Sequence, residues 1–364
     1  MSGQDTRTDT ATDTGADTRT DMDTHTGRDG ETKVTVWVAL GANLLIAVAK
    51  LAGGLLSASP ALLSEAAHSV ADSLNEVFLL ASLKRSKRPP DAGHPFGYGK
   101  ERFFWSLIAA VGIFVTGGCF SFFQGFEALT TGSSETRTGY AVGLSVLFVA
   151  LLAEGASLVR ALLQVRAQAR AAGRRMRTEV RRSNDPALRT VLAEDGTACL
   201  GVLLALVGMG LHMATGEVVY EAVASLLIGT LLVYIAYALG RSAKDQLIGE
   251  AADPELQRRI RDYLGEQPEI DTVTAALTMH LGPDSVMLAA RVDLVPDLDS
   301  EVVEAALVRI KHGLERECPG LDQVFLDVID ASAEDRRHAL RERAALDRRL
   351  EAAEEAAEAA EAAK

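Results

Sequence analysis

Residues 62–76 read LLSEAAHSVADSLNE and lie inside an apolar segment that runs from about residue 61 to residue 83. The stretch nevertheless contains five polar groups, namely Glu65, His68, Asp72, Asn75 and Glu76. A charged side chain at bilayer depth costs about 2.5–3.5 kcal/mol on insertion scales, so it needs a partner, a cavity or a function. The stretch therefore predicts a membrane helix with a polar face, and it raises the question of what that face binds.

Six segments, this one included, are apolar over the roughly 20 residues that a spanning helix needs. They cover about 34–57, 61–83, 104–129, 139–163, 187–213 and 218–239. Lysine and arginine are concentrated in the links after the second and the fourth segment, and the positive-inside rule places these links in the cytoplasm. Both termini then lie in the cytoplasm as well, and we expect a multi-pass protein of the cell (inner) membrane, surrounded by the lipid bilayer.

The chain outside the transmembrane domain, 31–240, divides into three parts. Residues 1–30 repeat Thr and Asp, which predicts a disordered tail, and residues 333–364 are rich in Ala, Glu and Arg, which predicts a charged helical tail. Residues 241–332 carry patterns that predict helix 254–265, strands 270–280 and 286–295, helix 300–317 and strand 322–330. The predicted fold class is an α-helical membrane protein with six transmembrane helices, followed by a cytoplasmic α+β domain of order αββαβ.

Charge and cysteine content exclude some classes of function. The net charge of −13 comes mostly from the tails and the soluble part. No basic patch is interleaved with aromatic residues, so we expect no nucleic-acid partner. The three cysteines, Cys119, Cys199 and Cys318, are far apart and form no pair motif, so we interpret them as small core residues.

His68 and Asp72 are four residues apart, which places both side chains on one face of a helix, roughly 6 Å apart along its axis. Imidazole nitrogen and carboxylate oxygen are ligands for zinc and for related divalent metals. The pair supplies only two ligands, so a tetrahedral site needs a second helix. The alternative is a structural hydrogen bond between the two side chains.

The fifth apolar segment offers the missing carboxylates, because Glu194 and Asp195 lie within it. One divalent cation between Asp72 and Asp195 is charge-neutral, with neutral His68 as a third ligand, and each group then offsets the desolvation cost of the others. Among the remaining membrane acids, Glu65 is interpreted as an exit-path or proton group, and Glu154 as a packing or relay group. Glu221 lies near an outer helix end, where we expect it to snorkel to water.

Three motifs carry a resemblance to a known family. They are SEAAHSVADSLN (64–75), HPFGYGKER (94–102) and NLLIAVAKLAGGLLSASPALLSEA (43–66), the last including Asn43 and Lys50. Together they resemble the cation diffusion facilitator family over about residues 34–330. LAEDGTACLG (192–201), combined with LLSEAAHSVAD (62–72), is most similar to the branch that includes the animal mitochondrial zinc transporter.

The resemblance implies a homodimer that exports zinc or a related divalent metal in exchange for protons and carries a ferredoxin-like cytoplasmic domain. It also implies a metal site of His68, Asp72 and Asp195. Where many members have a further ligand on the fifth helix, this chain has Val191, which cannot bind metal. Water, Glu194 or Asn43 remain as the fourth ligand. Glu194 lies about 100° round the helix from Asp195, so it needs a rotation or a bend to reach the same site.

Metal sites outside the membrane are also suggested by the resemblance. Some bacterial relatives bind a second metal in the loop between the second and third helices, where Asp91 and His94 match but Tyr98 replaces a second histidine. The alternative is that HPFGYG shapes the turn while Lys100 and Arg102 anchor the third helix. In the soluble domain, Leu277 and Arg291 occupy positions where relatives have ligands, so we expect this domain to dimerise mainly without zinc.

The sequence thus predicts a divalent cation efflux transporter, not an enzyme, that exchanges metal for protons by alternating access between the second and fifth helices. Zn²⁺ is the expected substrate, and Mn²⁺, Fe²⁺ and Co²⁺ are alternatives for a site rich in oxygen ligands. A non-transporting membrane scaffold or metal sensor that acts through the cytoplasmic domain is the competing hypothesis, and Val191 supports it. An intramembrane hydrolase lacks a convincing nucleophile, because only Ser69 and Ser73 flank the His–Asp pair.

Overall fold

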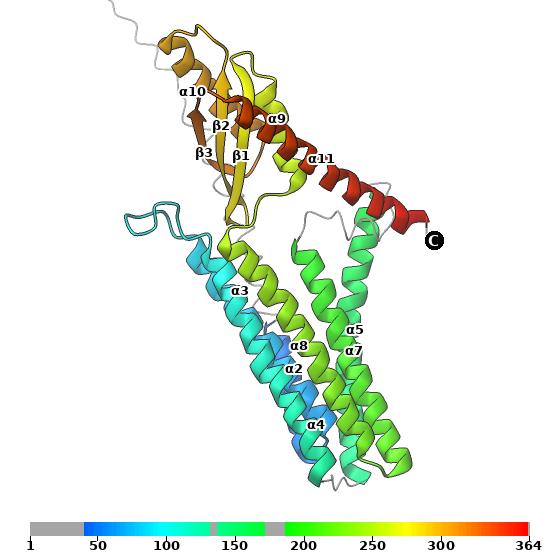
Figure 1. Cartoon of the computed structure of the whole chain (residues 1–364). Coiled ribbons are helices and arrows are strands. Elements are labelled where there is room, and N and C mark those ends of the chain that lie inside the picture. The colour runs from blue at the N-terminus through cyan, green and yellow to red at the C-terminus, as the bar shows by residue number, and fades with distance from the viewer. Residues whose placement is uncertain (1–39, 132–136, 172–185, 363–364) are drawn as a thin grey trace, which may run out of the picture.

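The computed structural model describes residues 40–131, 137–171 and 186–362, and shows long helices packed into a bundle with a small α/β domain at one end (Figure 1). The predicted tail 1–30 and most of the arginine-rich link after the fourth span lie outside the described residues. The long helices of the bundle are Leu40–Ser57, α2 (Pro60–Ser86), the continuous run of α3 (Glu101–Gly112), η1 (Ile113–Cys119) and α4 (Phe120–Thr131), α5 (Arg137–Ala171), α7 (Pro186–Thr215) and α8 (Val219–Ile248).

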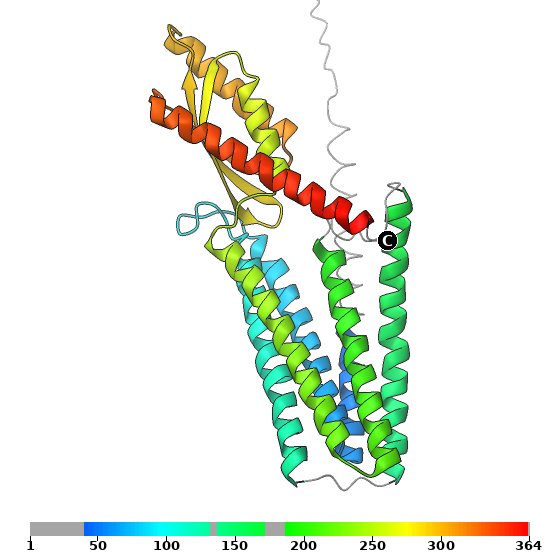
Figure 2. The same ribbon diagram turned by 45° about the vertical axis from the view of Figure 1, so that its right-hand side comes forward.

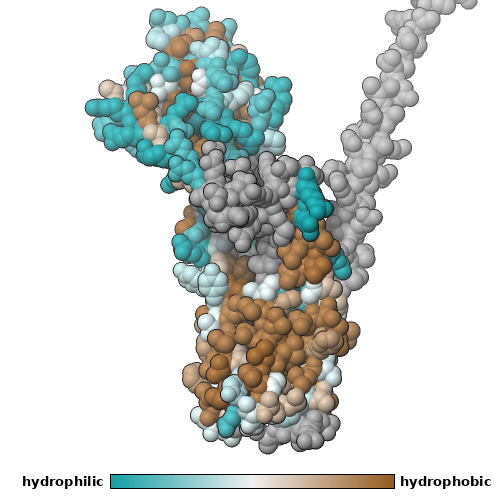
Figure 3. Space-filling view, turned by 90° about the vertical axis from the view of Figure 1, so that its right-hand side faces the viewer, coloured by the Kyte–Doolittle hydropathy of each residue, from teal (hydrophilic) through white to brown (hydrophobic). Residues whose placement is uncertain are grey.

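Five of these helices are long and apolar enough to cross a membrane, and α2 is the one that does not meet that criterion. The reason lies in its composition, because α2 carries the polar residues of the 62–76 stretch. It packs against α3, α4, α7 and α8, so that many of its side chains are buried in the bundle. The predicted order of six helices is therefore confirmed, and Figure 3 shows the apolar band that the bundle presents on one face.

The ends of α2 follow from its local sequence. Ser59 is the N-cap, and its side chain accepts a hydrogen bond from the backbone N–H of Leu62, while Pro60 occupies the first helical turn. Lys84 and Arg85 lie in the last turn, where positive charge interacts favourably with the negative end of the helix dipole. The tight link before α2 joins it to Leu40–Ser57 as the predicted hairpin, with Ala58 at a positive φ of 56°.

The soluble domain has the predicted αββαβ order, with α9 (Pro254–Gly265), β1 (Ile270–Gly282), β2 (Ser285–Leu294), α10 (Ser300–Glu317) and β3 (Leu321–Val328). The sheet has the order β1-β2-β3, in which β2 pairs antiparallel with β1 and parallel with β3. Its core joins Ile260 and Leu264 of α9 to Leu288 of β2 and to Ile310 and Leu314 of α10, all of them fully buried.

The α2–α3 loop contacts the β1–β2 hairpin and thereby connects the bundle to the soluble domain. A Cβ atom on Gly99 would lie 2.4 Å from the carbonyl oxygen of Leu281, so this close approach requires glycine. Phe96 in the same loop lies edge-on to Phe325 of β3, with ring centroids 6.4 Å apart. The HPFGYG segment therefore packs the loop against the soluble domain.

The predicted C-terminal helical tail is a single helix, α11 (Ala333–Ala362), which leaves the soluble domain and extends over the near end of the bundle (Figures 1 and 2). Its first half packs against β1 and α9. Arg336 donates hydrogen bonds to Asp271 and, at 2.5 Å, to Asp293, while Arg343 reaches Asp262 at 3.2 Å. The Arg336 guanidinium holds the pKa of the Asp271 carboxyl below its usual range.

We predict that Arg336→Ala detaches the start of α11, because Asp293 is nearly buried and loses a charged partner. Amide hydrogen exchange over 333–345 should accelerate at least about tenfold, whereas Arg337→Ala, whose guanidinium bonds the Ala333 carbonyl of its own helix, should change little. The pKa of Asp271 is lower in the folded protein than in the unfolded chain, where it is about 3.9. The Asp271–Arg336 pair therefore stabilises the folded protein above that pH, and this stabilisation is lost as the pH falls below it. Equal exchange in both variants would contradict this role.

Candidate metal site

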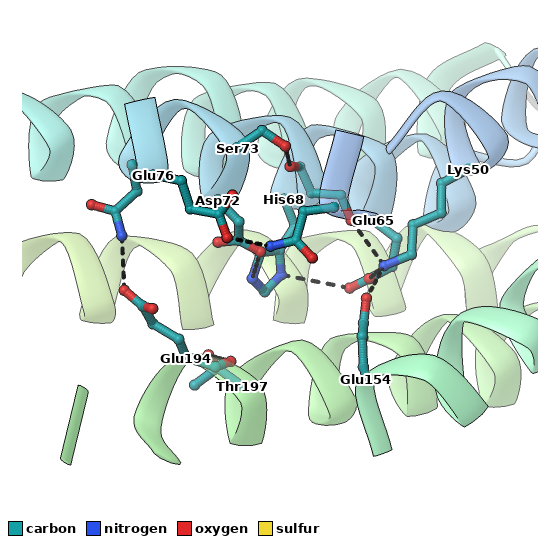
Figure 4. A network of polar contacts seen from close by, with 12 residues as sticks. Lys50, Glu65, His68, Asp72, Ser73, Glu76, Glu154, Glu194 and Thr197 are labelled. Carbon is teal, nitrogen blue, oxygen red and sulfur yellow. Dashed lines mark hydrogen bonds and ion pairs between the residues drawn. The ribbon is translucent and has the colours of Figure 1, made fainter. Parts of the chain in front are cut away.

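His68 and Asp72 lie on one face of α2, as their spacing predicts (Figure 4). The Nε2 atom of His68 is 3.3 Å from Oδ2 of Asp72. The His68 side chain is buried, whereas that of Asp72 is 32% exposed. The two ligand atoms therefore face each other across a gap that a cation can share, with the carboxylate on the more accessible side.

The two acids of α7 point toward different neighbours. Glu194 faces α2, where its Oε1 accepts a hydrogen bond of 2.8 Å from Asn75 (Figure 4). Asp195 faces α5, where its Oδ2 accepts a hydrogen bond of 2.7 Å from Ser157. Consecutive residues lie about 100° apart round a helix, so the rotation of α7 presents only one of them to α2. In this structure that residue is Glu194.

The structure thus brings His68 and Asp72 together but leaves Asp195 apart from them. Among the described residues, no group of three His, Cys, Asp or Glu side chains is close enough to hold a metal ion. The side chain of Val191 lies outside the described part of α7. The predicted fourth ligand Asn43 also has another partner, since its Nδ2 donates to Oε1 of Glu76 at 2.6 Å.

A buried ion-pair network next to His68 was not predicted from the sequence. The Nζ atom of Lys50 lies 2.9 Å from Oε2 of Glu65 and 2.6 Å from Oε1 of Glu154, and it donates to the Ser69 hydroxyl at 3.0 Å (Figure 4). The side chains of Lys50 and Glu65 are 1% and 0% exposed. The sequence feature that could have indicated this network is a lysine in an otherwise apolar span, together with two membrane acids on other helices. Partners on three different helices could not be matched without the tertiary structure.

The expectation that Glu221 snorkels to water is wrong. Its side chain is fully buried, with Nδ1 of His212 at 2.6 Å and a hydrogen bond from the hydroxyl of Ser59. The turn between α7 and α8 brings His212 opposite Glu221. The rings of Tyr140 and His212 pack in a T-shaped arrangement with their centroids 5.4 Å apart. The Glu221 carboxylate is thus stabilised by His212 and Ser59 rather than by water.

Asp91 and His94 lie together in the α2–α3 loop, as the second predicted metal site requires. Oδ1 of Asp91, however, accepts hydrogen bonds from the backbone N–H groups of Gly93 and His94, and Oδ2 accepts one of 2.7 Å from the Tyr98 hydroxyl. The bond from Tyr98 holds the pKa of the Asp91 carboxyl below its usual range. Nδ1 of His94 is 3.6 Å from Asp91. This geometry favours the alternative in which the HPFGYG segment shapes the turn, with Asp91 bonded to it.

The soluble domain places Leu277 on an exposed position of β1, and Arg291 pairs with Asp327 across β2 and β3 at 3.4 Å. Asp327 is therefore neutralised by an arginine, which does not favour a metal there. Dimerisation of this domain without zinc stays a prediction.

Comparison with known proteins agrees with the predicted fold class. The family model of the cation efflux transmembrane domain matches residues 36–248. Metal tolerance protein C4 of Arabidopsis thaliana is 34% identical over 258 residues, which are 71% of this chain and 56% of the plant protein. The human mitochondrial proton-coupled zinc antiporter SLC30A9 is 33% identical over 258 residues, which are 71% of this chain and 45% of the human protein.

A bacterial protein is matched over more of its length. The manganese efflux system protein MneP of Bacillus subtilis is 24% identical over 299 residues, which are 80% of this chain and 93% of that protein. The chain spans about half the length of the plant and animal relatives. From the motifs, the helix order and these matches, the chain belongs to the cation diffusion facilitator family of multi-pass membrane transporters, in the branch that includes the animal mitochondrial zinc antiporters.

Proposed function

We propose that this protein exports a divalent cation from the cytoplasm in exchange for protons, with Zn²⁺ as the substrate and His68 and Asp72 as its first ligands. The observation that carries the proposal is the 3.3 Å approach of His68 Nε2 to Asp72 Oδ2 on a helix inside the bundle. The functions named for its relatives support it, because they include proton-coupled zinc antiport and manganese efflux. Mn²⁺, Fe²⁺ and Co²⁺ remain alternative substrates.

The polar groups of α2 suggest how the cation arrives. Asn75 and Glu76 lie one turn beyond Asp72 toward the end of α2 that adjoins the soluble domain, and they bond Glu194 and Asn43. We take that end as the cytoplasmic side, so both termini and the soluble domain face the cytoplasm. Glu194 then lies at the cytoplasmic entrance of the site, and a cation passes Glu194 before the cation reaches Asp72.

Proton coupling follows from ligand chemistry. Zinc binds neutral imidazole and ionised carboxylates, so loading the site releases protons. Protonation of the same ligands on the outer side favours release of the metal, and an inward proton gradient therefore drives outward metal movement. Asp195 completes the site when α7 rotates by about 100°, which replaces Glu194 with Asp195 on the side of α2.

Transport is tested by reconstituting the purified full-length protein into vesicles that contain a zinc-sensitive dye. We expect zinc flux that follows an imposed pH gradient and stops when an ionophore collapses the gradient. Well-folded protein that moves none of Zn²⁺, Mn²⁺, Fe²⁺ and Co²⁺ would instead favour the scaffold or metal sensor.

The same assay tests the two acids of α7. Glu194→Gln should raise the zinc concentration for half-maximal flux by about tenfold, and Asp195→Asn should lower the maximal rate by at least that factor. The first change weakens arrival of the cation, and the second removes a ligand of the loaded site. Glu127→Gln, at an exposed position of α4, is the matched control and should behave as wild type. Wild-type flux in both α7 variants would remove α7 from the metal site.

A further inference from the structure

Three metal-ligand atoms beside Lys50 are buried without a hydrogen-bond partner. They are Oε1 of Glu65, Nδ1 of His68 and Oε2 of Glu154. Such atoms are uncommon in folded proteins, because burying a polar atom without a partner is costly. Nδ1 of His68 lies 3.8 Å from Oε1 of Glu65, and the second oxygen of each glutamate binds the ammonium of Lys50 (Figure 4). The two unpaired carboxylate oxygens therefore belong to groups that share one ammonium, and Nδ1 of His68 lies beside one of these oxygens.

This region is also short of positive charge. Two carboxylates meet one ammonium, which leaves a net charge of −1 while His68 is neutral. A divalent cation in place of the ammonium would make the charge zero and would give the unpaired oxygens and nitrogen a partner. Two carboxylate oxygens and an imidazole nitrogen are a donor set that zinc and related metals accept.

We propose that Glu65, Glu154 and Nδ1 of His68 form a second site for the transported cation, one step outward from Asp72, and that Lys50 fills this site when no metal is there. The inference rests on the proposed function. His68 faces both sites, since Nε2 lies toward Asp72 and Nδ1 lies toward Glu65. A neutral imidazole offers one nitrogen lone pair at a time, so His68 serves one site or the other, and the ring proton changes nitrogen when the cation moves. The cation therefore passes from one side of the imidazole to the other without leaving protein ligands.

Lys50 is suited to act as an exchangeable tethered cation. Its four-carbon stem is flexible and its ammonium is a compact point charge, so it can leave the carboxylates when a metal approaches. The ammonium and a divalent cation repel each other, which makes their occupancy mutually exclusive. With Lys50 in place, one oxygen of each carboxylate binds its ammonium instead of a metal. This agrees with the finding that the described residues contain no ready cluster of three ligands.

Removing the tethered charge should expose the second site. We would measure zinc bound per protomer by equilibrium dialysis of the full-length protein in detergent. Wild type and Lys50→Arg should bind one tight zinc ion, and Lys50→Gln should bind two, with His68 serving one ion while Glu65, Glu154 and water hold the other. The double variant Lys50→Gln/Glu65→Gln should return to one, because it lacks a carboxylate of the second site.

Size-exclusion chromatography shows whether Lys50→Gln stays folded, and a second variant covers the case in which it does not. Glu65→Gln keeps Lys50 and should bind one zinc ion with wild-type affinity while zinc flux falls at least about tenfold. A folded Lys50→Gln protein that binds one ion, or full flux in Glu65→Gln, would overturn the second site. Dialysis measures binding and the vesicle assay measures transport, so the two proposals fail separately. Absence of flux in the wild-type protein would overturn the proposed function. An unchanged number of zinc ions bound by Lys50→Gln would overturn the second site.

Discussion

Asp72→Ala is expected to abolish zinc flux in the vesicle assay, with a reduction of at least about 100-fold. Asp72 supplies the carboxylate that faces Nε2 of His68 at 3.3 Å. Without it, a divalent cation in this partly buried site has one negative charge too few, and breaking a buried charge pair costs about 3–5 kcal/mol. A cost of about 2.8 kcal/mol already corresponds to the 100-fold loss. The measurement is the initial rate of dye response under a fixed pH gradient.

The neighbouring Ser73→Ala serves as the matched control for this change. The Ser73 hydroxyl donates to the Ser69 carbonyl within α2 at 2.9 Å, so its removal should leave the metal ligands in place and the flux near wild type. Zinc flux in Asp72→Ala at the level of Ser73→Ala would show that the cation does not use the His–Asp pair.

Gly201→Ala is expected to have the second-largest effect, with loss of both flux and stability. A Cβ atom at this position of α7 would lie 2.1 Å from Oε1 of Glu65 and 3.5 Å from Nδ1 of His68. Glu65 is fully buried and bound to Lys50, so the contact is relieved only if α7 shifts away from α2 or the carboxylate moves. Overpacking of this kind costs about 1–3 kcal/mol. We expect zinc flux to fall at least about tenfold and the melting temperature to fall with it.

Gly210→Ala on the same helix is the control for adding a methyl group to α7. Apart from the backbone of α7 itself, no atom of the described residues lies within 4 Å of the Cβ that would be added there. Alanine is the better helix former, so this variant should be neutral or more stable by up to about 1 kcal/mol. Identical flux and melting temperature in the two variants would contradict the packing of Gly201 against Glu65.

Much of the architecture could be predicted because it depends on local patterns. A spanning helix needs only about 20 apolar residues in a row, and the half-buried strands of the soluble domain need only alternation, so both follow from short windows of sequence. The helix α9 and the αββαβ order agree with the prediction for this reason. The shared face of His68 and Asp72 is equally local, because spacing by four residues determines it in any α-helix.

The candidate site was predictable only in part, as the acids of α7 show. Glu194 and Asp195 are adjacent, and the choice between them depends on how α7 is rotated against α2 and α5. No local pattern encodes that rotation, because it results from packing along the whole length of three helices. The structure presents Glu194 to Asn75 and Asp195 to Ser157, although the motif alone favoured Asp195 as the ligand.

The sequence by itself determined the helices, the order of the soluble domain, the family and the His–Asp pair, because each depends on residues close together in the chain. The tertiary structure alone decided which buried charges meet. Lys50 is paired with Glu65, 15 residues away, and with Glu154, 104 residues away, and Glu221 is paired with His212 across a helical hairpin. A buried charge is stabilised by whichever opposite charge lies within a few ångströms, and that distance is set by helix packing rather than by position in the sequence.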